Sequence, residues 1–220
     1  MYFEAIGSSF YTQIIEASTG TGHLPMILAG ENSGLQVDKL RQELNKAGVT
    51  FCGGIFPKVI NKNSCSDRGV VVKMLPVHNK PLIISTRQPL DENWLAAQGF
   101  PLNDSEPVSY ITWLSEPGIA SNSFLKQLQQ VLPHLSVISG GGAGYSTFEK
   151  KPCIFNNEGF YEQGALVIPV AMNCDICARH GFGRLYGPVL ATRAESNLLA
   201  EINWEPACEL YQKILKDKSD

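Results

Sequence analysis

The amino-acid sequence predicts an α/β fold of mixed β-sheet, in one sheet or in two packed sheets, with flanking helices, built from a duplicated β-α-β-β unit. Three observations predict it. The composition, with 44% hydrophobic and 18% charged residues, is that of a globular protein. Short apolar runs alternate with segments whose apolar residues recur at helical spacing. The same order of segments occurs twice, approximately over residues 24–100 and 108–215. We expect residues 1–220 to form a single domain.

The first copy begins with an apolar run at residues 24–29, which predicts a strand. A polar turn follows, and the spacing of the next apolar residues predicts a helix at 37–47. The apolar run 49–54 predicts a second strand that runs through paired glycines into a tight turn. A polar, hairpin-like excursion then leads to a third strand at 68–72 and to the segment 81–87.

The second copy repeats this order. It has a predicted strand at 108–114, a helix at 122–132 and a strand at 136–142 that again ends in glycines. In each copy the strand-helix-strand start predicts a parallel pair, while the later strands follow short connections and are expected to be antiparallel. The later segments also correspond: 163–167 matches 68–72, and 188–193 matches 81–87.

The remaining segments flank or join the two copies. Residues 3–17 predict a strand and a short helix, with Ser8 or Ser9 as its cap. Residues 90–104 join the copies, and because this segment contains Trp94, Leu95 and Phe100 as candidates for burial, we expect the halves to share one core. A helix is predicted at 206–216, with a proline in its first turn and basic residues at its end.

Charge and hydropathy argue against several classes of function. The 18 Lys and Arg residues against 21 Asp and Glu give a net charge of -3 without a basic cluster, so we expect no nucleic-acid partner and no polybasic membrane anchor. The apolar runs are far shorter than the ~20 residues that cross a bilayer. The N-terminus does not resemble a secretory signal, so we expect a cytoplasmic protein whose six cysteines are mostly reduced.

The glycine run Gly140, Gly141 and Gly142 is one candidate site. Glycines beside a strand end expose backbone N–H groups, which suit a carboxylate or phosphate. The run lacks the residues of a phosphate-binding loop and does not match the dinucleotide fingerprint. A structural interpretation stands beside the functional one, because the glycines also allow positive φ and close packing between the halves.

The loop 179–188 is a second candidate, because it contains His180, Arg184 and several turn-forming residues. Arginine grips carboxylates and histidine can donate, accept or bind a metal, although a lone loop histidine is more often structural. Cys174 and Cys177 precede His180 but lack the second half of a zinc site, so we expect no zinc. Non-covalent haem through a histidine stays open.

A third candidate is the segment 192–197, in which Arg193, Glu195 and Asn197 are polar neighbours. It is either a helix cap formed by Thr192 or Ser196 with solvated charges, which is the simpler interpretation, or one wall of a site. We find no Ser/His/Asp order, nucleophile elbow or paired-carboxylate signature in the sequence. We therefore expect a binding protein rather than an enzyme.

The chain resembles the FIST N-terminal domain, a sensory module of bacterial signalling proteins that also occurs in an animal F-box protein. The resemblance covers nearly the whole chain and is strongest in the second half. The matching stretches are residues 140–170 with Phe148, then His180-Gly181, Gly187-Pro188, residues 192–197 and residues 201–207. A further C-terminal FIST domain normally follows in the family.

The resemblance implies a small ligand, with amino acids proposed for the family, and signalling rather than turnover. Some bacterial members are nitric-oxide-responsive haem proteins that regulate histidine kinases or cyclase pathways, so His180 is the axial ligand to test. The F-box relative implies a third possibility, a protein-interaction platform. Since pockets favour domain junctions, we expect the ligand, an amino acid or small carboxylate, to bind where the halves meet. The predicted lining is Gly140, Gly141, Gly142, His180, Arg184, Arg193, Glu195 and Asn197.

Overall fold

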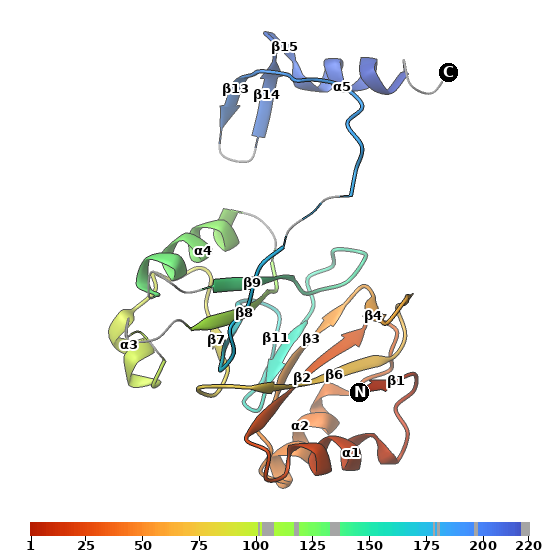
Figure 1. The fold of residues 1–220 in the computed structure, drawn as a ribbon, viewed down its shortest axis with the longest axis vertical. Helices are drawn as coiled ribbons and strands as arrows, with labels where there is room; N and C mark the ends of the chain where they lie inside the picture. The colour runs from red at the N-terminus through yellow and green to blue at the C-terminus, as the bar shows by residue number, and fades with distance from the viewer. Residues whose placement is uncertain are drawn as a thin grey trace. The chain divides into compact units, whose positions relative to one another are not determined.

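The computed structural model describes residues 1–100, 102, 108–116, 119–132, 137–177, 179, 181–195 and 198–216. The chain divides into two compact units, Met1–Ile176 and Cys177–Asp220, which are described separately below (Figure 1). The expectation that residues 1–220 form a single domain stays a prediction.

The first unit contains both helices and strands. Its helices are α1 (Ser9–Ser18), α2 (Val37–Lys46), α3 (Glu92–Ala97) and α4 (Ile119–Val131). Its strands are β1 (Tyr2–Phe3), β2 (His23–Gly30), β3 (Cys52–Phe56), β4 (Val59–Asn61), β5 (Ser64–Ser66), β6 (Val70–Pro76), β7 (Leu82–Ile84), β8 (Ser109–Leu114), β9 (Val137–Gly142), β10 (Ile154–Asn156), β11 (Phe160–Tyr161) and β12 (Ala165–Val170).

Two mixed sheets form the centre of the first unit. The six-stranded sheet has the order β1-β6-β2-β3-β10-β11, and the four-stranded sheet has the order β7-β12-β8-β9. As predicted, β2 and β3 are parallel, β8 and β9 are parallel, and the later strands β6 and β12 run antiparallel to β2 and β8. The predicted mixed α/β fold with flanking helices is confirmed.

Each sheet contains strands from both sequence copies. The hairpin of β10 and β11, from the second copy, pairs with β3 of the first copy. Conversely, β7 from the first copy pairs with β12 of the second copy. Neither copy of the sequence therefore forms a complete sheet alone. Residues of both copies contribute to each hydrophobic cluster, but there are two such clusters among the described residues, not the one shared core that the sequence predicts.

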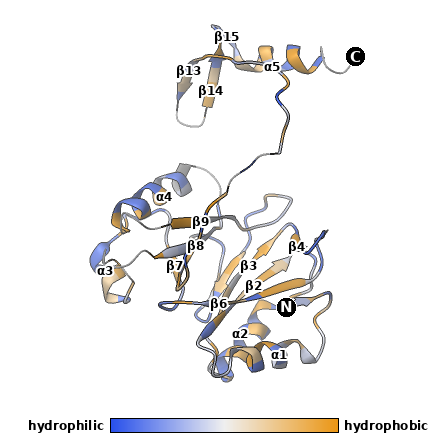
Figure 2. Cartoon of the chain, in the orientation of Figure 1, coloured by the Kyte–Doolittle hydropathy of each residue, from blue (hydrophilic) through white to orange (hydrophobic). Residues whose placement is uncertain are grey.

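Strand β12 lies between the two hydrophobic clusters. Leu166 and Ile168 belong to a cluster with residues of α1, α2 and the six-stranded sheet, while Ala165 and Val167 belong to a cluster with residues of α3 and α4. Side chains alternate between the faces of a strand, so β12 is apolar on both faces. In Figure 2, β2 and β3 are likewise coloured mainly as hydrophobic. The layers are thus helices, sheet, sheet and helices.

The segment that joins the copies contains a helix that the sequence analysis missed. The carboxylate of Asp91 accepts hydrogen bonds from the N–H groups of Asn93 and Trp94 and so caps α3. Leu95 and Phe100 are buried, as predicted, but Trp94 is 41% exposed, so that part of the prediction is wrong. At α1, Ser8 is in the N-cap position without a side-chain capping bond.

The glycine runs form strands rather than the predicted tight turns. Gly53 and Gly54 lie within β3, and Gly140, Gly141 and Gly142 lie within β9. Each run pairs with its parallel neighbour through backbone hydrogen bonds, with Gly53 opposite Ile27 in the first copy. The prediction of a turn was wrong because glycine was taken as a signal for a change of chain direction, whereas here it permits close approach of two strands, and at Gly140 also a φ of +153° within the strand.

The second unit is a small antiparallel sheet with one helix. It consists of β13 (Ala191–Glu195), β14 (Leu198–Ile202), β15 (Glu205–Pro206) and α5 (Ala207–Lys216). The capping role predicted for Thr192 is wrong, because this residue lies on β13 and its hydroxyl accepts a hydrogen bond from the N–H of Trp204 at 3.0 Å. Arg193 is also not merely solvated, because it pairs with Glu201 of β14 at 3.0 Å.

Candidate functional site

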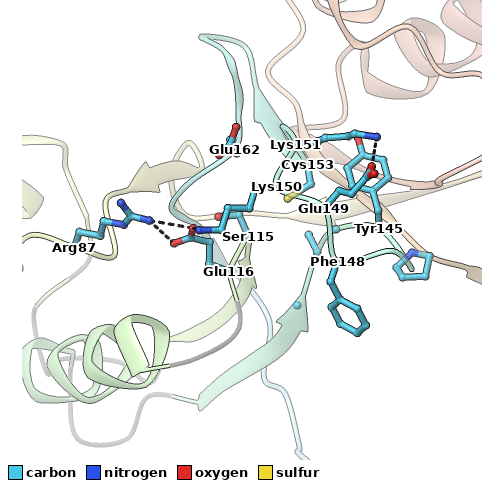
Figure 3. Close-up of a pocket in the computed structure, with 14 residues that line it drawn as sticks. Arg87, Ser115, Glu116, Tyr145, Phe148, Glu149, Lys150, Lys151, Cys153 and Glu162 are labelled. Carbon is cyan, nitrogen blue, oxygen red and sulfur yellow. Dashed lines mark hydrogen bonds and ion pairs between the residues drawn. The ribbon is translucent and has the colours of Figure 1, made fainter.

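The first unit has a cavity of about 570 Å³ at the carboxyl ends of both parallel strand pairs. Pro57 follows β3, Ser115 follows β8 and Gly142 ends β9. The cavity is therefore placed by the topology, since the carboxyl ends of parallel strands lie at the same edge of a sheet. Its lining residues, most of them labelled in Figure 3, are Pro57, Arg87, Ser115, Glu116, Gly142, Ala143, Gly144, Tyr145, Phe148, Glu149, Lys150, Lys151, Cys153 and Glu162.

The loop 143–153 forms one side of the cavity and bridges the two sheets. The N–H of Ala143 donates to the carbonyl of Leu114 at 2.8 Å, at the end of β8. The next N–H, of Gly144, donates to the carbonyl of Ile55 in β3 at 2.8 Å. Successive residues thus bond to different sheets, so the chain passes from the four-stranded sheet to the six-stranded sheet at the cavity.

Two further contacts fix this loop. Its Ser146 donates from the backbone N–H and from the hydroxyl to the carboxylate of Glu31, at 2.8 and 2.7 Å. Within the loop, the hydroxyl of Tyr145 donates to the carbonyl of Pro152 at 2.9 Å. Because Glu31 directly follows β2, the loop is held by groups at the ends of β2, β3 and β8, which come from both sheets.

One ion-pair network crosses the cavity. A terminal nitrogen of Arg87 lies 3.1 and 3.2 Å from the two carboxylate oxygens of Glu116, and these side chains face each other in Figure 3. The ammonium group of Lys150 lies 3.8 Å from the same carboxylate. The side chain of Glu116 is only 17% exposed, against 53% for Arg87 and 72% for Lys150. A half-buried carboxylate therefore holds two more exposed cations.

The remaining charges are arranged differently. Lys151 and Glu149 form an ion pair on the loop, and the hydrogen bond from Lys151 lowers the pKa of the Glu149 carboxyl. Glu162 also lines the cavity, and its carboxylate makes no hydrogen bond or ion pair with any described residue. The lining thus has three cations and three carboxylates, of which Glu162 is without a cationic partner among the described residues.

The cavity also contains a thiol and a phenol. Cys153 is buried, and burial, with the nearby charges of Glu162 and Glu116, raises the pKa of its thiol to about 12. Burial is also the main cause that raises the pKa of Tyr145. Because the thiolate is the reactive form of cysteine, Cys153 is unreactive near neutral pH.

The structure separates the sequence-predicted site residues into two groups. Gly140, Gly141 and Gly142 are in the first unit, and Gly142 lines the cavity. Arg184, Arg193 and Glu195 are in the second unit, which is described by itself. His180 and Asn197 lie outside the described residues. The joint site that these residues were expected to form therefore stays a prediction.

Sequence reasoning missed the charged residues of the cavity. Arg87 was noted only as the end of a repeated segment, and Glu116 only as part of a polar turn. One signal could have found Glu116, because it lies two residues after the predicted strand 108–114, at the end where ligands bind in α/β folds. No comparable signal marks Lys150, whose position depends on how the loop 143–153 folds back.

Histidine and cysteine positions bear on the metal and haem predictions. Within the described ranges, no group of three or more His, Cys, Asp or Glu side chains is placed to hold a metal ion. His23 and His78 line a separate cavity of about 510 Å³ at the start of β2, not the one at the strand ends. His134 and His180 lie outside the described residues, so haem ligation stays a prediction.

Fold and cavity together define an α/β domain with two packed mixed sheets and a charged cavity at the ends of its parallel strands. The FIST N domain family matches residues 26–205, and the chain belongs to this family. FIST domains are sensory domains of signalling proteins. No curated protein and no solved structure gives a significant match. Among the described residues, no helix is both long and apolar enough to span a membrane.

Proposed function

We propose that the cavity at the ends of β3, β8 and β9 is the input site of a sensory domain and binds an amino acid or a small carboxylate. The observation that carries this proposal is the lining, which combines three cations and three carboxylates with the apolar surfaces of Pro57, Tyr145 and Phe148. A volume of about 570 Å³ is within the usual range for small-molecule sites.

The charges suit a ligand with a carboxylate and an amine. Arg87 and Lys150 are the groups that would bind a carboxylate, since charge-assisted hydrogen bonds to arginine are strong and directional. Glu162 is the group that would bind an ammonium, because its carboxylate has no partner among the described residues. A ligand with a carboxylate but no amine would contact Arg87 and Lys150 alone.

Ligand binding would act through the loop 143–153. This loop lines the cavity, and it bonds to Leu114, Ile55 and Glu31 at the ends of three strands. A ligand that contacts Lys150 would therefore favour one arrangement of the loop relative to both sheets. We propose a signalling protein, such as a histidine kinase or a cyclase, as the downstream partner.

We place this activity in the cytoplasm and propose binding without turnover. All six cysteines are free thiols, which fits a reducing compartment. The thiol in the cavity, Cys153, has a raised pKa, which does not suit a nucleophile. Haem ligation by His180 stays an alternative prediction, and a Soret band that appears on haem addition and is lost in His180→Ala would establish it.

A thermal-shift screen with the twenty amino acids and small carboxylates tests the proposal. A ligand at 100 times its Kd stabilises the folded state by about 2.7 kcal/mol, which raises the Tm by several degrees. Arg87→Gln should reduce the shift, whereas Lys73→Gln, an exposed lysine on β6, should not. The proposal fails if no compound raises the Tm, or if Arg87→Gln leaves the shift unchanged.

A further inference from the structure

We propose that Glu116 is an internal competitor that occupies the anion-binding position of the cavity, so that a ligand carboxylate binds only by displacing it from Arg87 and Lys150. This inference rests on the proposed function, because it describes how the same cavity is regulated. It assigns a role to a residue that the sequence analysis passed over as part of a turn.

The contacts of Glu116 are those that a bound carboxylate would make. Both of its oxygens lie within 3.2 Å of one terminal nitrogen of Arg87, and Lys150 approaches one of them to 3.8 Å. The carboxylate is 17% exposed and the two cations are more than half exposed. Both cations line the cavity and are open to solvent, so a second carboxylate can reach them.

The backbone of Glu116 is fixed while its partners are on different segments. Glu116 follows β8 by two residues, and the hydroxyl of Ser121 in α4 donates to its carbonyl. Arg87 comes from the connection after β7, and Lys150 comes from the loop 143–153. Exchange of Glu116 for a ligand would thus release or re-form a link among three segments that lie far apart in the sequence.

Two carboxylates cannot both use the same two cations at full strength. Removing the charge of Glu116 frees Arg87 and Lys150 for the ligand, so Glu116→Gln should tighten carboxylate binding. Any nearby carboxylate also repels an anion through space. The experiment must separate this general repulsion from direct competition for Arg87 and Lys150. Glu162→Gln is the matched control for a probe without an ammonium group, which leaves Glu162 nothing to bind. Glu162 lines the same cavity and makes no ion pair with either cation in the described part of the chain.

Acetate, the simplest carboxylate, is the probe. We would titrate it against the wild type and both variants and follow the Nε–Hε signal of Arg87 by NMR. Glu116→Gln should lower the Kd by about three- to tenfold, the range expected between an exposed and a half-buried ion pair. Glu162→Gln should lower it by less than about twofold, because a screened through-space charge has a weak effect. In an Arg87→Gln background, where binding is followed by the backbone amide signals of the loop 143–153, the effect of Glu116→Gln should largely disappear.

A measurement without ligand tests the ion pair that joins Glu116 to Lys150 on the loop 143–153. Trypsin should cleave after Lys150 several times faster in Glu116→Gln than in the wild type or in Glu162→Gln, because the loop loses a tether; the bond after Lys151 precedes Pro152 and resists trypsin. Glu116→Asp is the second variant if Glu116→Gln unfolds, and its shorter carboxylate should give an intermediate acetate affinity. Equal acetate affinities in Glu116→Gln and Glu162→Gln, or equal cleavage rates in both, would overturn the inference. If acetate binding tightens as expected while no compound of the screen binds the wild type, only the proposed function fails.

Discussion

A β carbon on Gly140 would lie 1.8 Å from the carbonyl oxygen of Thr112, the residue opposite it in the parallel pair of β8 and β9. The first copy has the same relationship, because a β carbon on Gly53 would lie 2.0 Å from the carbonyl oxygen of Ile27. In both copies, the glycine is required by the close approach of two strands. For Gly140 this supports the structural interpretation of the glycine run.

Because of this geometry, we expect alanine substitutions at Gly140 and Gly141 to differ in their effect on stability. Gly140→Ala should lower the free energy of unfolding by more than about 2 kcal/mol, because the new methyl group collides with backbone that cannot rotate away. Gly141→Ala is the matched control, since its β carbon would meet only the ring of Trp113 at 3.7 Å. That variant should cost less than about 1 kcal/mol. Urea unfolding followed by circular dichroism measures both, and equal losses would contradict the interpretation.

Asn157 should be a major stabilising contact outside the cavity. Its side-chain oxygen accepts from the N–H of buried Phe51 at 2.9 Å, and its amide donates to Asn45 at 2.6 Å and to the carbonyl of Val49 at 2.8 Å. Asn157→Ala leaves these groups unpaired, and we expect a loss of about 1–3 kcal/mol. Asn63→Ala, on an exposed turn, should change the free energy of unfolding by less than about 0.5 kcal/mol. If the loss in Asn157→Ala were as small as the loss expected for Asn63→Ala, water would be replacing these hydrogen bonds.

The six thiols should differ in reactivity. Burial raises the pKa of Cys153 to about 12 and that of Cys52 further still, while Cys65, Cys177 and Cys208 are exposed. Iodoacetamide at pH 8 should therefore alkylate the exposed thiols and leave Cys52 and Cys153 unmodified until urea is added. Peptide mass spectrometry identifies each site. Rapid modification of Cys153 in the folded protein would contradict this prediction. It would show that the cavity opens enough for iodoacetamide to reach a thiol that is buried in the structure.

The raised pKa of Cys153 also predicts a loss of stability at high pH. The thiol ionises near its ordinary value of 9.0 when the chain is unfolded, but near 12 when it is folded. Between these values the unfolded state loses a proton that the folded state keeps, so the free energy of unfolding falls as pH rises. Ionisation of this thiol lowers the free energy of unfolding by at most about 1.4 kcal/mol per pH unit. Below pH 9 the thiol keeps its proton in both states, so its contribution to stability is fully present there.

Urea unfolding between pH 8.5 and 10.5 would measure this effect. Cys153→Ala should be less stable than the wild type at pH 8.5, because it loses buried sulfur contacts. The difference between the two should narrow as pH rises, since the variant has no thiol to ionise at that position. Parallel curves for the two proteins would contradict the assignment of the shift to Cys153.

Much of the fold was predictable because it depends on local patterns. The helical spacing of Val37, Leu40 and Leu44 predicted α2 to within one residue of its observed end, and the alternation of apolar strands and helices predicted both parallel pairs. Errors arose where one residue type has two uses. Glycine in β9 was interpreted as a turn signal, and Thr192 as a cap, although both lie on strands.

The candidate site was much less predictable. The sequence drew attention to residues that are rare and close together, such as His180 and Arg184, and these are in the second unit or outside the described residues. The cavity is instead lined by common charged residues such as Arg87, Glu116 and Lys150, which are far apart in the chain. No local pattern marks such residues, because their proximity arises only when the loop and the strand ends meet.

By itself, the sequence determined the class of fold, the order of most elements and the family, since hydrophobic periodicity and short motifs are local properties of the chain. Tertiary structure alone decided which copy supplies each strand, so that β7 and β10 lie in the sheet of the other half. It also decided the partner of Glu116, because an ion pair depends on a distance of a few ångströms between residues that the sequence separates by about thirty positions. Pairing between distant segments depends on the packing of the whole core, so the hydrophobic periodicity of one segment does not predict it.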